Sequence, residues 1–322
     1  MAGFTVLVTA MHLADEAQRM LADAGARLLF MPDPIDEGSL IERLASTPVD
    51  AIILRGSRPI TARVMAAGPT LRIIAKNGAG VDSVDLAEAT RRGIVVAVAS
   101  SANADAVAEM TLSIMLSLVR DVVRLDRKVR RGEWETTAYQ GRDLRGSVVG
   151  IVGYGSIGQR AARLAAALGT RVLVHRLSGV ADDFEVDADF DRFLSRVDVL
   201  SLHCPLTERT RGLIGERELS LMKPGALIVN TARGAVIDEP ALVAALRSGR
   251  LGGAGLDTFV HEPLGPDHPL LALDNVILTP HIAGVTRDAA VRVATITAKN
   301  VIDVMQGRDV AASNLVRLSG RS

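Results

Sequence analysis

The sequence predicts an α/β protein with two doubly wound parallel-sheet domains. Short apolar, β-branched runs alternate with helix-like segments along most of the 322 residues, and the alternation stops once near the middle of the chain and then resumes. Strands that alternate with helices are typical of parallel sheets. A chain of this length is long for one hydrophobic core and sufficient for two.

The first part of the chain is expected to form alternating strands and helices. Its apolar N-terminal run lacks a basic segment and is followed by charged residues, so we expect a first strand and not a signal peptide. Thr61 is expected to cap a helix. The periodicity predicts strands at 4–10, 27–30, 50–54, 71–75 and 94–98, and helices at 14–24, 38–45, 61–67 and 85–92.

The pattern changes after the last of these strands. Residues 103–129 contain no proline or glycine and are expected to form one long helix that crosses from one domain to the next. A polar loop at 132–146, with the only tryptophan, Trp134, follows. Strands are then expected at 148–152, 171–174, 197–202, 226–230, 253–256 and 276–278, and a last helix at 287–305 is expected to return the chain to the first domain.

Composition excludes several classes of function. The hydrophobic content of 48% and the charged content of 23% are ordinary for a soluble enzyme. The formal net charge is zero, which argues against nucleic acid or an anionic membrane as a partner. Cys204 is the single cysteine, so no intramolecular disulfide is possible, and no metal site is expected. No apolar run is long enough to span a bilayer, and a cytoplasmic protein is expected.

A glycine-rich turn predicts a bound dinucleotide. Gly153, Gly155 and Gly158 form a G-x-G-x-x-G pattern between the apolar run 148–152 and a helix-permissive run at 159–168. The first glycine permits a tight turn, the second lets a pyrophosphate approach the backbone, and the third lets the helix pack closely on the strand. The pattern alone is weak, and the flanking strand and helix make it informative.

The end of the next strand favours NADP(H). In a dinucleotide-binding unit this position normally holds an acidic residue that binds the adenosine ribose. Arg176 stands there, 18 residues after Gly158, and the nearest carboxylates, Asp182 and Asp183, lie beyond a turn. A guanidinium binds a 2′-phosphate in a bidentate manner, and Ser178 can add a donor. The alternative is an exposed arginine in a protein that uses NAD(H) or both cofactors.

Three later strand ends carry residues suited to hydride transfer. Arg233, Glu262 and His281 each follow a predicted strand. The arginine can hold the carboxylate of a 2-oxo acid and polarise its carbonyl, and the histidine can exchange a proton with the alkoxide. A carboxylate beside the histidine stabilises the imidazolium and orients the ring. Taken singly, each residue has a simpler explanation: the arginine as a surface ion pair, the glutamate as a loop charge, and the histidine as a structural residue.

Several ordered motifs give the chain its resemblance to a known family. They are GAGVD at 78–82, NADAVAE at 103–109, the glycine turn at 153–158, HCPLT at 203–207, NTARG at 230–234, Asp257, Glu262-Pro263 and PHIAG at 280–284. With these motifs the chain resembles the D-isomer-specific 2-hydroxyacid dehydrogenases, which include phosphoglycerate dehydrogenases and glyoxylate/hydroxypyruvate reductases. The resemblance covers nearly all of the sequence.

The resemblance implies a role for each motif. Arg233 would bind the substrate carboxylate and carbonyl, His281 would be the acid/base and Glu262 its partner. Asp257 and the Ala232 region would orient the nicotinamide carboxamide, and the amides of the 78–80 turn would receive the substrate carboxylate. The implied cofactor contacts are Gly153, Tyr154, Gly155, Ser156, Ile157, Gly158, His175, Arg176, Ser178, His203, Cys204, Pro205, Thr207, Thr231, Ala232, Asp257 and Gly284. The implied substrate contacts are Arg55, Lys76, Asn77, Gly78, Ala79 and Gly80.

The resemblance also implies the domain organisation. Residues 1–101 and 288–322 would form a flavodoxin-like substrate domain, and residues 102–287 an inserted Rossmann-type NAD(P)-binding domain. Subunits of the family pair through their cofactor domains, so a homodimer is expected.

Departures from the family pattern narrow the substrate. Formate dehydrogenases carry Gln where this chain has Glu262, and the basic Arg176 is typical of the glyoxylate/hydroxypyruvate reductase branch. Ser83 and Met110 stand where Asn and His are frequent. Glyoxylate or hydroxypyruvate is therefore favoured as substrate.

Two alternatives remain open. Arg55 and Lys76 fall where phosphoglycerate dehydrogenases place cations, so a phosphoglycerate dehydrogenase without a regulatory domain is one of them. The plainer reading is that Arg55 caps a strand end and Lys76 flanks the loop. The alternative of another class is an NAD(P)-sensing, corepressor-like binding protein.

Overall fold

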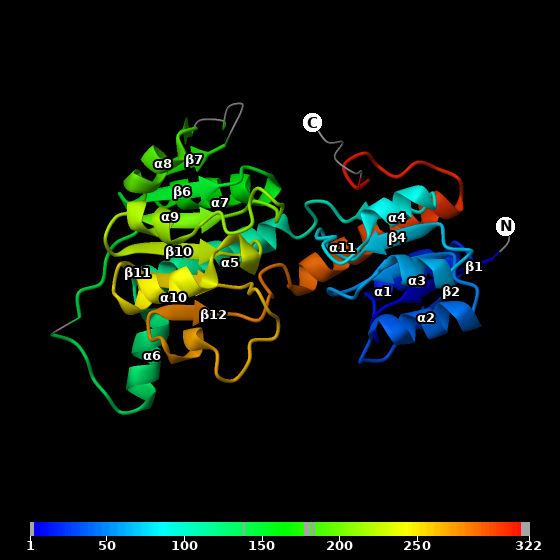
Figure 1. The fold of residues 1–322 in the computed structure, drawn as a ribbon, viewed down its shortest axis with the longest axis horizontal. Coiled ribbons are helices and arrows are strands. Elements are labelled where there is room, and N and C mark those ends of the chain that lie inside the picture. Colours follow the sequence, from blue (N-terminus) through cyan, green and yellow to red (C-terminus); the bar gives the residue numbers. More distant parts are fainter. Residues whose placement is uncertain (1–2, 138, 177–180, 182–183, 317–322) are drawn as a thin grey trace. The chain divides into compact units, whose positions relative to one another are not determined.

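The chain divides into two compact units, each with its own parallel sheet. The computed structural model describes residues 3–137, 139–176, 181 and 184–316. Unit 1 comprises Met1–Asn103 and Val285–Ser322, and unit 2 comprises Ala104–Gly284. Figure 1 shows the elements of both units coloured along the sequence.

Unit 1 is built on a five-stranded parallel sheet with the strand order β2-β1-β3-β4-β5. This is the flavodoxin-like order, in which the order of strand addition reverses between β1 and β3. The strands are β1 (Phe4–Val8), β2 (Ala26–Phe30), β3 (Ala51–Leu54), β4 (Ile73–Lys76) and β5 (Val95–Val98).

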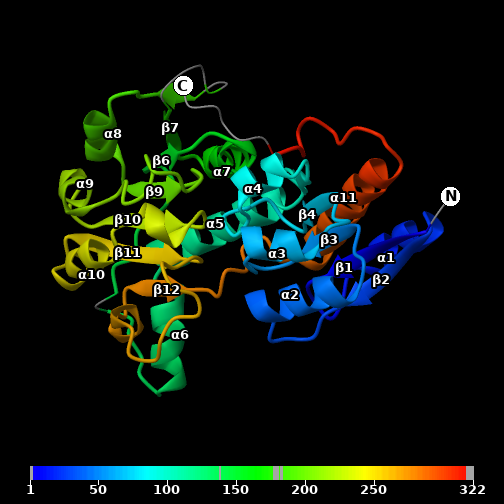
Figure 2. The ribbon, with the colours of Figure 1, turned by 45° about the vertical axis from the view of Figure 1, so that its right-hand side comes forward.

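Helices cover both faces of this sheet. Alternate residues of a strand point to opposite faces, so Val6 and Val8 pack under α1 and α11, whereas Leu7 packs under α2 and α3. Figure 2 shows α2, α3 and α4 along one side of the sheet and α11 on the other. The bounds are α1 (Asp15–Asp23), α2 (Glu37–Ser46), α3 (Ala62–Ala67), α4 (Leu86–Arg91) and α11 (Arg287–Met305).

Side-chain caps set where four of these helices begin, and two of the caps are threonines. The Thr61 hydroxyl accepts a hydrogen bond from the Val64 amide at 3.3 Å, which confirms the predicted cap of α3. Thr286 caps α11 in the same way through the Ala289 amide, at 3.0 Å. Helix α11 packs on α1 and on the sheet of unit 1, so the C-terminal helix does return the chain to the first unit.

Unit 2 is built on a seven-stranded parallel sheet with the order β12-β11-β10-β9-β6-β7-β8. The strand order reverses between β6 and β9, which makes the carboxyl ends of these two strands the expected ligand site of a doubly wound sheet. The strands are β6 (Val148–Val152), β7 (Arg171–His175), β8 (Glu185–Val186), β9 (Val199–Leu202), β10 (Ala226–Asn230), β11 (Leu251–Leu256) and β12 (Val276–Leu278).

Two hydrophobic clusters lie on the two faces of this sheet. One packs α5 and α7 against the strands, and the other packs α8, α9 and α10. The predicted fold class, with two doubly wound parallel sheets, is thereby confirmed. The helices are α5 (Ala104–Val119), α6 (Val122–Arg130), α7 (Ser156–Ala167), α8 (Phe190–Arg196), α9 (Glu216–Leu221) and α10 (Glu239–Arg247), with 3₁₀ turns η1 (Gly234–Val236) and η2 (Pro269–Ala272).

The prediction of one long helix over 103–129 was wrong. The segment is broken between α5 and α6 at Asp121, which adopts a left-handed conformation with φ 51°. Aspartate tolerates this conformation better than most residues, and no glycine or proline marks the break. Both helices belong to unit 2, so neither crosses between the units; the chain passes from one to the other at Asn103 and Ala104.

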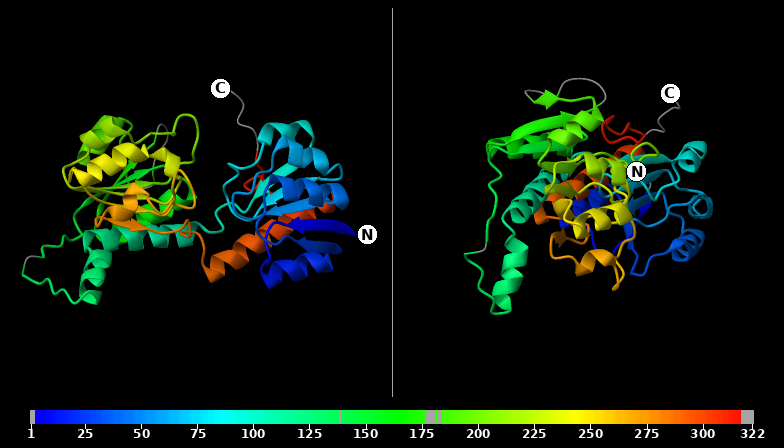
Figure 3. Two further views of the ribbon diagram at one scale, coloured as in Figure 1. Left: turned by 60° about the horizontal axis from the view of Figure 1, so that its bottom comes forward. Right: turned by 60° about the vertical axis from the view of Figure 1, so that its left-hand side comes forward.

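Helix α6 stands away from the sheet of unit 2, as both views of Figure 3 show. None of its residues, all of which the structure describes, is buried. Val122 and Val129 on this helix are 51% and 52% exposed, and Trp134 in the segment that follows is 80% exposed.

Candidate active site

The glycine turn lies at the carboxyl end of β6, where the strand order reverses. Gly153 has φ +91°, and a Cβ there would lie 2.7 Å from the backbone nitrogen of Cys204. A Cβ at Gly158, in the first turn of α7, would lie 2.0 Å from the carbonyl oxygen of Gly153. Among the described residues nothing lies within 4 Å of a Cβ built at Gly155, the N-cap of α7. Two glycines are therefore required by packing, and the middle one faces open space.

That open space suits a phosphate group. The amides of Ser156, Ile157 and Gly158 begin α7, and an α-helix leaves its first amides without an intrahelical partner. These amides and the helix dipole favour an anion at this end of the helix. The residues present thus fit the pyrophosphate of a dinucleotide cofactor.

The loop after β9 lies beside the glycine turn. The His203 amide donates to the Val152 carbonyl at 2.8 Å, and the His203 ring bonds the Ser201 hydroxyl through Nε2, also at 2.8 Å. Burial lowers the pKa of His203 to about 4, so this imidazole is neutral at pH 7. Burial also raises the pKa of the Cys204 thiol, which disfavours a thiolate. Pro205 and Thr207, the other predicted contacts of this loop, are exposed.

Arg176 follows β7 and lies close to the glycine turn. Its guanidinium carbon is 5.9 Å from the centre of the Tyr154 ring. The neighbouring His175 is held differently, because its Nδ1 bonds the Asp187 carbonyl at 2.9 Å and its ring packs on Phe190. Ser178, a predicted cofactor contact, lies outside the described residues.

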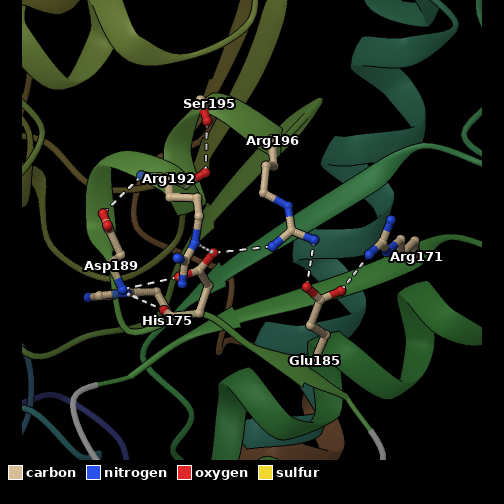
Figure 4. A network of polar contacts seen from close by, with 8 residues as sticks. Arg171, His175, Glu185, Asp189, Arg192, Ser195 and Arg196 are labelled. Carbon is tan, nitrogen blue, oxygen red and sulfur yellow. Dashed lines mark hydrogen bonds and ion pairs between the residues drawn. The ribbon is translucent and has the colours of Figure 1, made fainter.

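A network of ion pairs fixes β7, the strand that ends directly before Arg176. Arg196 donates hydrogen bonds to both Glu185 and the buried Asp187. Figure 4 shows Glu185 between Arg196 and Arg171. Arg192 completes the network by binding both oxygens of Asp187, at 2.7 and 2.9 Å. These guanidinium contacts hold the pKa of the Asp187 carboxyl below its ordinary value. This network joins β7, β8 and α8, and no local pattern in the sequence predicts it.

Arg233 lies in the loop that follows β10. The side chain of Asn230 bridges this loop, donating to the Arg233 carbonyl at 2.9 Å and accepting from the Ala232 amide at 3.0 Å. The half-buried guanidinium donates to the Ala232 carbonyl at 2.7 Å. The adjacent Thr231 is buried, and its hydroxyl lies 2.9 Å from that of Thr111 on α5.

The β10 and β11 loops touch at Gly234. A Cβ at this position would lie 2.0 Å from the carbonyl carbon of Phe259, so only glycine lets the two backbones approach this closely. Arg233 and Glu262 are thereby carried on two loops in direct contact.

Glu262 and His281 form a hydrogen-bonded pair. Glu262 Oε2 lies 2.8 Å from Nδ1 of His281, and Glu262 Oε1 accepts from the Phe259 amide at 3.0 Å. With a proton on Nδ1 shared with the carboxylate, Nε2 is left to exchange a proton with a substrate. The pair is partly exposed, with 43% of the His281 side chain and 34% of the Glu262 side chain accessible.

A cavity of about 360 Å³ adjoins Glu262 within unit 2. Its walls are largely apolar and come from the β11 and β12 loops and from η2. Besides Glu262 they comprise Phe259, Pro263, Leu264, Leu271, Leu278, Thr279 and Pro280.

Asp257, which directly follows β11, is buried and accepts hydrogen bonds from the loop after β12. Its carboxylate accepts hydrogen bonds from the Thr279 hydroxyl and from the amides of Ile282 and Ala283. Sequence reasoning singled out Asp257 but missed these donors, because Thr279 carries no signal in the sequence that links it to a residue 22 positions earlier. Gly284, also predicted to contact the cofactor, follows this segment and is partly exposed.

The predicted substrate contacts lie in unit 1, at the ends of β3 and β4. Gly78 has φ +151° and closes a turn on the Lys76 carbonyl, with a distance of 2.9 Å. Lys76 is only 8% exposed, and its ammonium group donates to the Gly56 carbonyl. Arg55 is exposed and donates to the His12 carbonyl at 3.2 Å. The remaining predicted contacts of the turn are Asn77 and Gly80, both partly exposed, and Ala79, which is exposed.

Two features are absent from the part of the chain that the structure describes. No helix there is long and apolar enough to cross a bilayer. No group of three or more His, Cys, Asp and Glu side chains in the same residues is arranged to hold a metal ion.

The sheet of unit 2 is doubly wound, and the N-terminus of α7 lies at the point where its strand order reverses. An acid–base pair follows the carboxyl ends of two other strands, β11 and β12. This arrangement is typical of a dinucleotide-dependent oxidoreductase. Residues 112–283 match the family model of the D-isomer specific 2-hydroxyacid dehydrogenase, NAD binding domain. The chain belongs to this family, as the resemblance implied, and the matched NAD-binding residues lie within unit 2.

Relatives and solved structures agree with this assignment. The chain is 41% identical to a glyoxylate reductase from Aeropyrum pernix, over 80% of this chain and 81% of that protein. It is 39% identical to a D-3-phosphoglycerate dehydrogenase from Archaeoglobus fulgidus, over 81% of this chain and only 50% of that protein. A crystal structure of a protein from Thermus thermophilus is similar with a TM-score of 0.90 and 36% identity, covering 98% of this chain and all of the other.

Proposed function

We propose that this protein reduces a small 2-oxo acid to the D-2-hydroxy acid with a nicotinamide cofactor, and that Arg233, Glu262 and His281 carry the reaction. The observation that supports this most strongly is the 2.8 Å contact between Glu262 Oε2 and His281 Nδ1, next to the loop that carries Arg233. An imidazole oriented by a carboxylate is suited to general acid–base catalysis.

The proposed roles follow from the chemistry of each side chain. When bound, the nicotinamide supplies or accepts the hydride at C2. Arg233 binds the substrate carboxylate and polarises the carbonyl, which stabilises the developing oxyanion. His281 donates a proton from Nε2 to that oxygen, and Glu262 stabilises the imidazolium through Nδ1. In the oxidative direction His281 takes the proton back.

Glyoxylate or hydroxypyruvate is the favoured substrate, and 3-phosphohydroxypyruvate is the alternative. The glyoxylate reductase from A. pernix is similar to this chain over most of its length. The ammonium of Lys76 is buried on the Gly56 carbonyl, which favours a structural role over phosphate binding. We propose for the same reason that the 78–80 turn, and not Lys76, contacts the substrate.

The test is a panel of 2-oxo acids with both cofactors. NADPH or NADH is mixed with glyoxylate, hydroxypyruvate, pyruvate and 3-phosphohydroxypyruvate, and loss of nicotinamide absorbance is followed. The fastest oxidation is expected with glyoxylate or hydroxypyruvate. Preference for 3-phosphohydroxypyruvate would establish the alternative. No oxidation with any of the four acids, by a protein that binds the cofactor, would favour the NAD(P)-sensing reading instead.

A preference for NADP(H) over NAD(H) is part of the proposal. The position after β7 that normally carries an acidic residue holds Arg176, and this guanidinium lies beside Tyr154 of the glycine turn. A cation at this position suits a 2′-phosphate and leaves the 2′-hydroxyl of NAD(H) without its usual acceptor.

We also propose a homodimer that forms through α6 and the segment after it. Val122, Val129 and Trp134 are more than half exposed there, and several exposed large apolar side chains on one segment are typical of a protein–protein interface. The mass of the protein in solution tests this by sedimentation. Val129→Asp combined with Trp134→Ser is expected to yield monomers, with Leu271→Ser, which alters a separate exposed leucine, as the control. A monomeric wild-type protein at micromolar concentration would contradict the proposal.

A further inference from the structure

Asp257 is bonded to the segment that carries His281. Its side chain is 1% exposed. Oδ1 accepts from the Thr279 hydroxyl at 2.6 Å and from the Ile282 amide at 2.9 Å, and Oδ2 accepts from the Ala283 amide at 2.8 Å. The donors flank His281 on both sides in the sequence, so the carboxylate holds together the 279–283 segment that carries the imidazole.

His281 has a backbone conformation that needs such support. Its φ of 56° lies in the left-handed region, which a residue with a Cβ rarely adopts. Holding a non-glycine residue there is energetically unfavourable, and the conformation persists only where the surrounding structure imposes it. The His281 amide donates to the Thr279 carbonyl at 3.0 Å, which closes a tight turn inside the same segment.

Asp257 is itself anchored on the central sheet. It directly follows β11, and its amide donates to the Asn230 carbonyl at the end of β10, at 3.0 Å. The carboxylate therefore holds the β12 loop in a fixed position relative to β10 and β11. Three hydrogen bonds to a buried carboxylate are each of the charge-assisted type, which is stronger than a neutral hydrogen bond.

We infer that Asp257 is a positioning residue for His281: it imposes the left-handed conformation at which Nδ1 of the imidazole meets Glu262. This deepens the proposed function, because it assumes that His281 is the acid/base. It differs from the role implied by the family resemblance, in which Asp257 orients the nicotinamide carboxamide, since three of the acceptor positions of the carboxylate are already used on the histidine segment.

Thr279 offers the sharpest test because it contacts Asp257 and belongs to none of the predicted cofactor or substrate sets. Thr279→Val keeps the size and branching of the side chain and removes the hydroxyl donor, whereas Thr279→Ser keeps the donor. The valine variant is expected to lower kcat about 10- to 100-fold, as loss of one charge-assisted hydrogen bond implies, with KM and the Kd for NADPH within about twofold. The serine variant is expected to retain the kcat of the wild type.

A spectroscopic measurement separates this inference from the proposed function. In ¹⁵N-labelled protein, the proton shared between His281 Nδ1 and Glu262 gives a signal that is assigned by its loss in His281→Gln. This signal is expected in the wild type and in Thr279→Ser, and to be lost or displaced in Thr279→Val and Asp257→Asn, whether or not the protein reduces a 2-oxo acid. An unchanged signal in both of the latter variants would overturn the inference. A fall of more than about 10-fold in NADPH affinity of Asp257→Asn, with the His281 signal intact, would overturn it in favour of the carboxamide role.

Discussion

Nδ1 of His281 and Oε2 of Glu262 meet at 2.8 Å, although the two residues follow different strands, β12 and β11. The same unit contains a second pair of this type, in which Nε2 of His268 lies 2.9 Å from Oε1 of Glu239. The second pair joins the 3₁₀ turn η2 to the first turn of α10 and plays no part in the proposed reaction. It therefore serves as a matched control for the first.

Glu262→Gln is expected to reduce turnover without loss of cofactor. A glutamine can still accept from the Phe259 amide, but a neutral amide stabilises an imidazolium less than a carboxylate does. We expect reductive kcat to fall at least about 10-fold and its optimum to move to lower pH, within the range of general acid–base contributions. Glu239→Gln is expected to leave both unchanged. Equal effects of the two substitutions on the pH–rate profile would refute the role of Glu262.

The glycine turn allows packing and cofactor binding to be separated. A Cβ at Gly155 has open space and no positive φ to oppose it, so Gly155→Ala is expected to fold normally and to weaken cofactor binding, because the methyl group occupies the approach of the pyrophosphate. Gly158→Ala would place a Cβ 2.0 Å from the Gly153 carbonyl oxygen and is expected to cost about 1–3 kcal/mol of folding free energy. Urea unfolding and NADPH titration measure the two effects. Tight NADPH binding by Gly155→Ala would show that the cofactor lies elsewhere.

The lowered pKa of His203 predicts how the free energy of unfolding depends on pH. Its pKa is about 4 in the folded protein and about 6.5 in an unfolded chain. As the pH falls from 6.5 towards 4, the unfolded chain therefore binds a proton that the native state does not, and stability decreases; below pH 4 both states are protonated and the effect ends. Between about pH 7 and about pH 5 the wild type should lose about 1–2 kcal/mol more than His203→Gln, measured by urea unfolding. The same loss in both proteins would contradict the burial of a neutral imidazole.

The cation at Arg176 is expected to determine the preference for NADPH over NADH. Arg176→Asp removes the cation proposed for the 2′-phosphate and supplies an acceptor for a ribose hydroxyl, so the ratio of NADPH to NADH affinity is expected to fall about 10- to 100-fold. Arg247→Asp, which changes an exposed arginine at the end of α10, should leave the ratio unchanged. Fluorescence titration of the bound nicotinamide measures both constants. An unaltered ratio in Arg176→Asp would place the determinant of specificity at another residue.

The sequence predicted the buried elements well because their patterns are local. β6, β10, β12 and α11 begin and end where the apolar runs and the helical period place them. What it missed depends on tertiary structure. The left-handed Asp121 breaks a segment that contains neither glycine nor proline, and β8 is only two residues long.

The same division applies to the candidate site. Residue type and position after a strand were enough to select Glu262 and His281, because the carboxyl ends of parallel strands share one edge. The left-handed conformation of His281 and its link to Asp257 through Thr279 were not predictable, since those hydrogen bonds join residues of two strand-end loops and no short-range pattern encodes them.

The most direct test of the account is the turnover of His281→Gln with the best 2-oxo acid of the panel and saturating NADPH. If His281 is the acid/base, kcat falls at least about 100-fold while the Kd for NADPH stays within about twofold of the wild type, and His268→Gln, from the matched pair, keeps the activity of the wild type. A His281→Gln protein that retains more than about a third of the wild-type kcat would contradict the proposed mechanism.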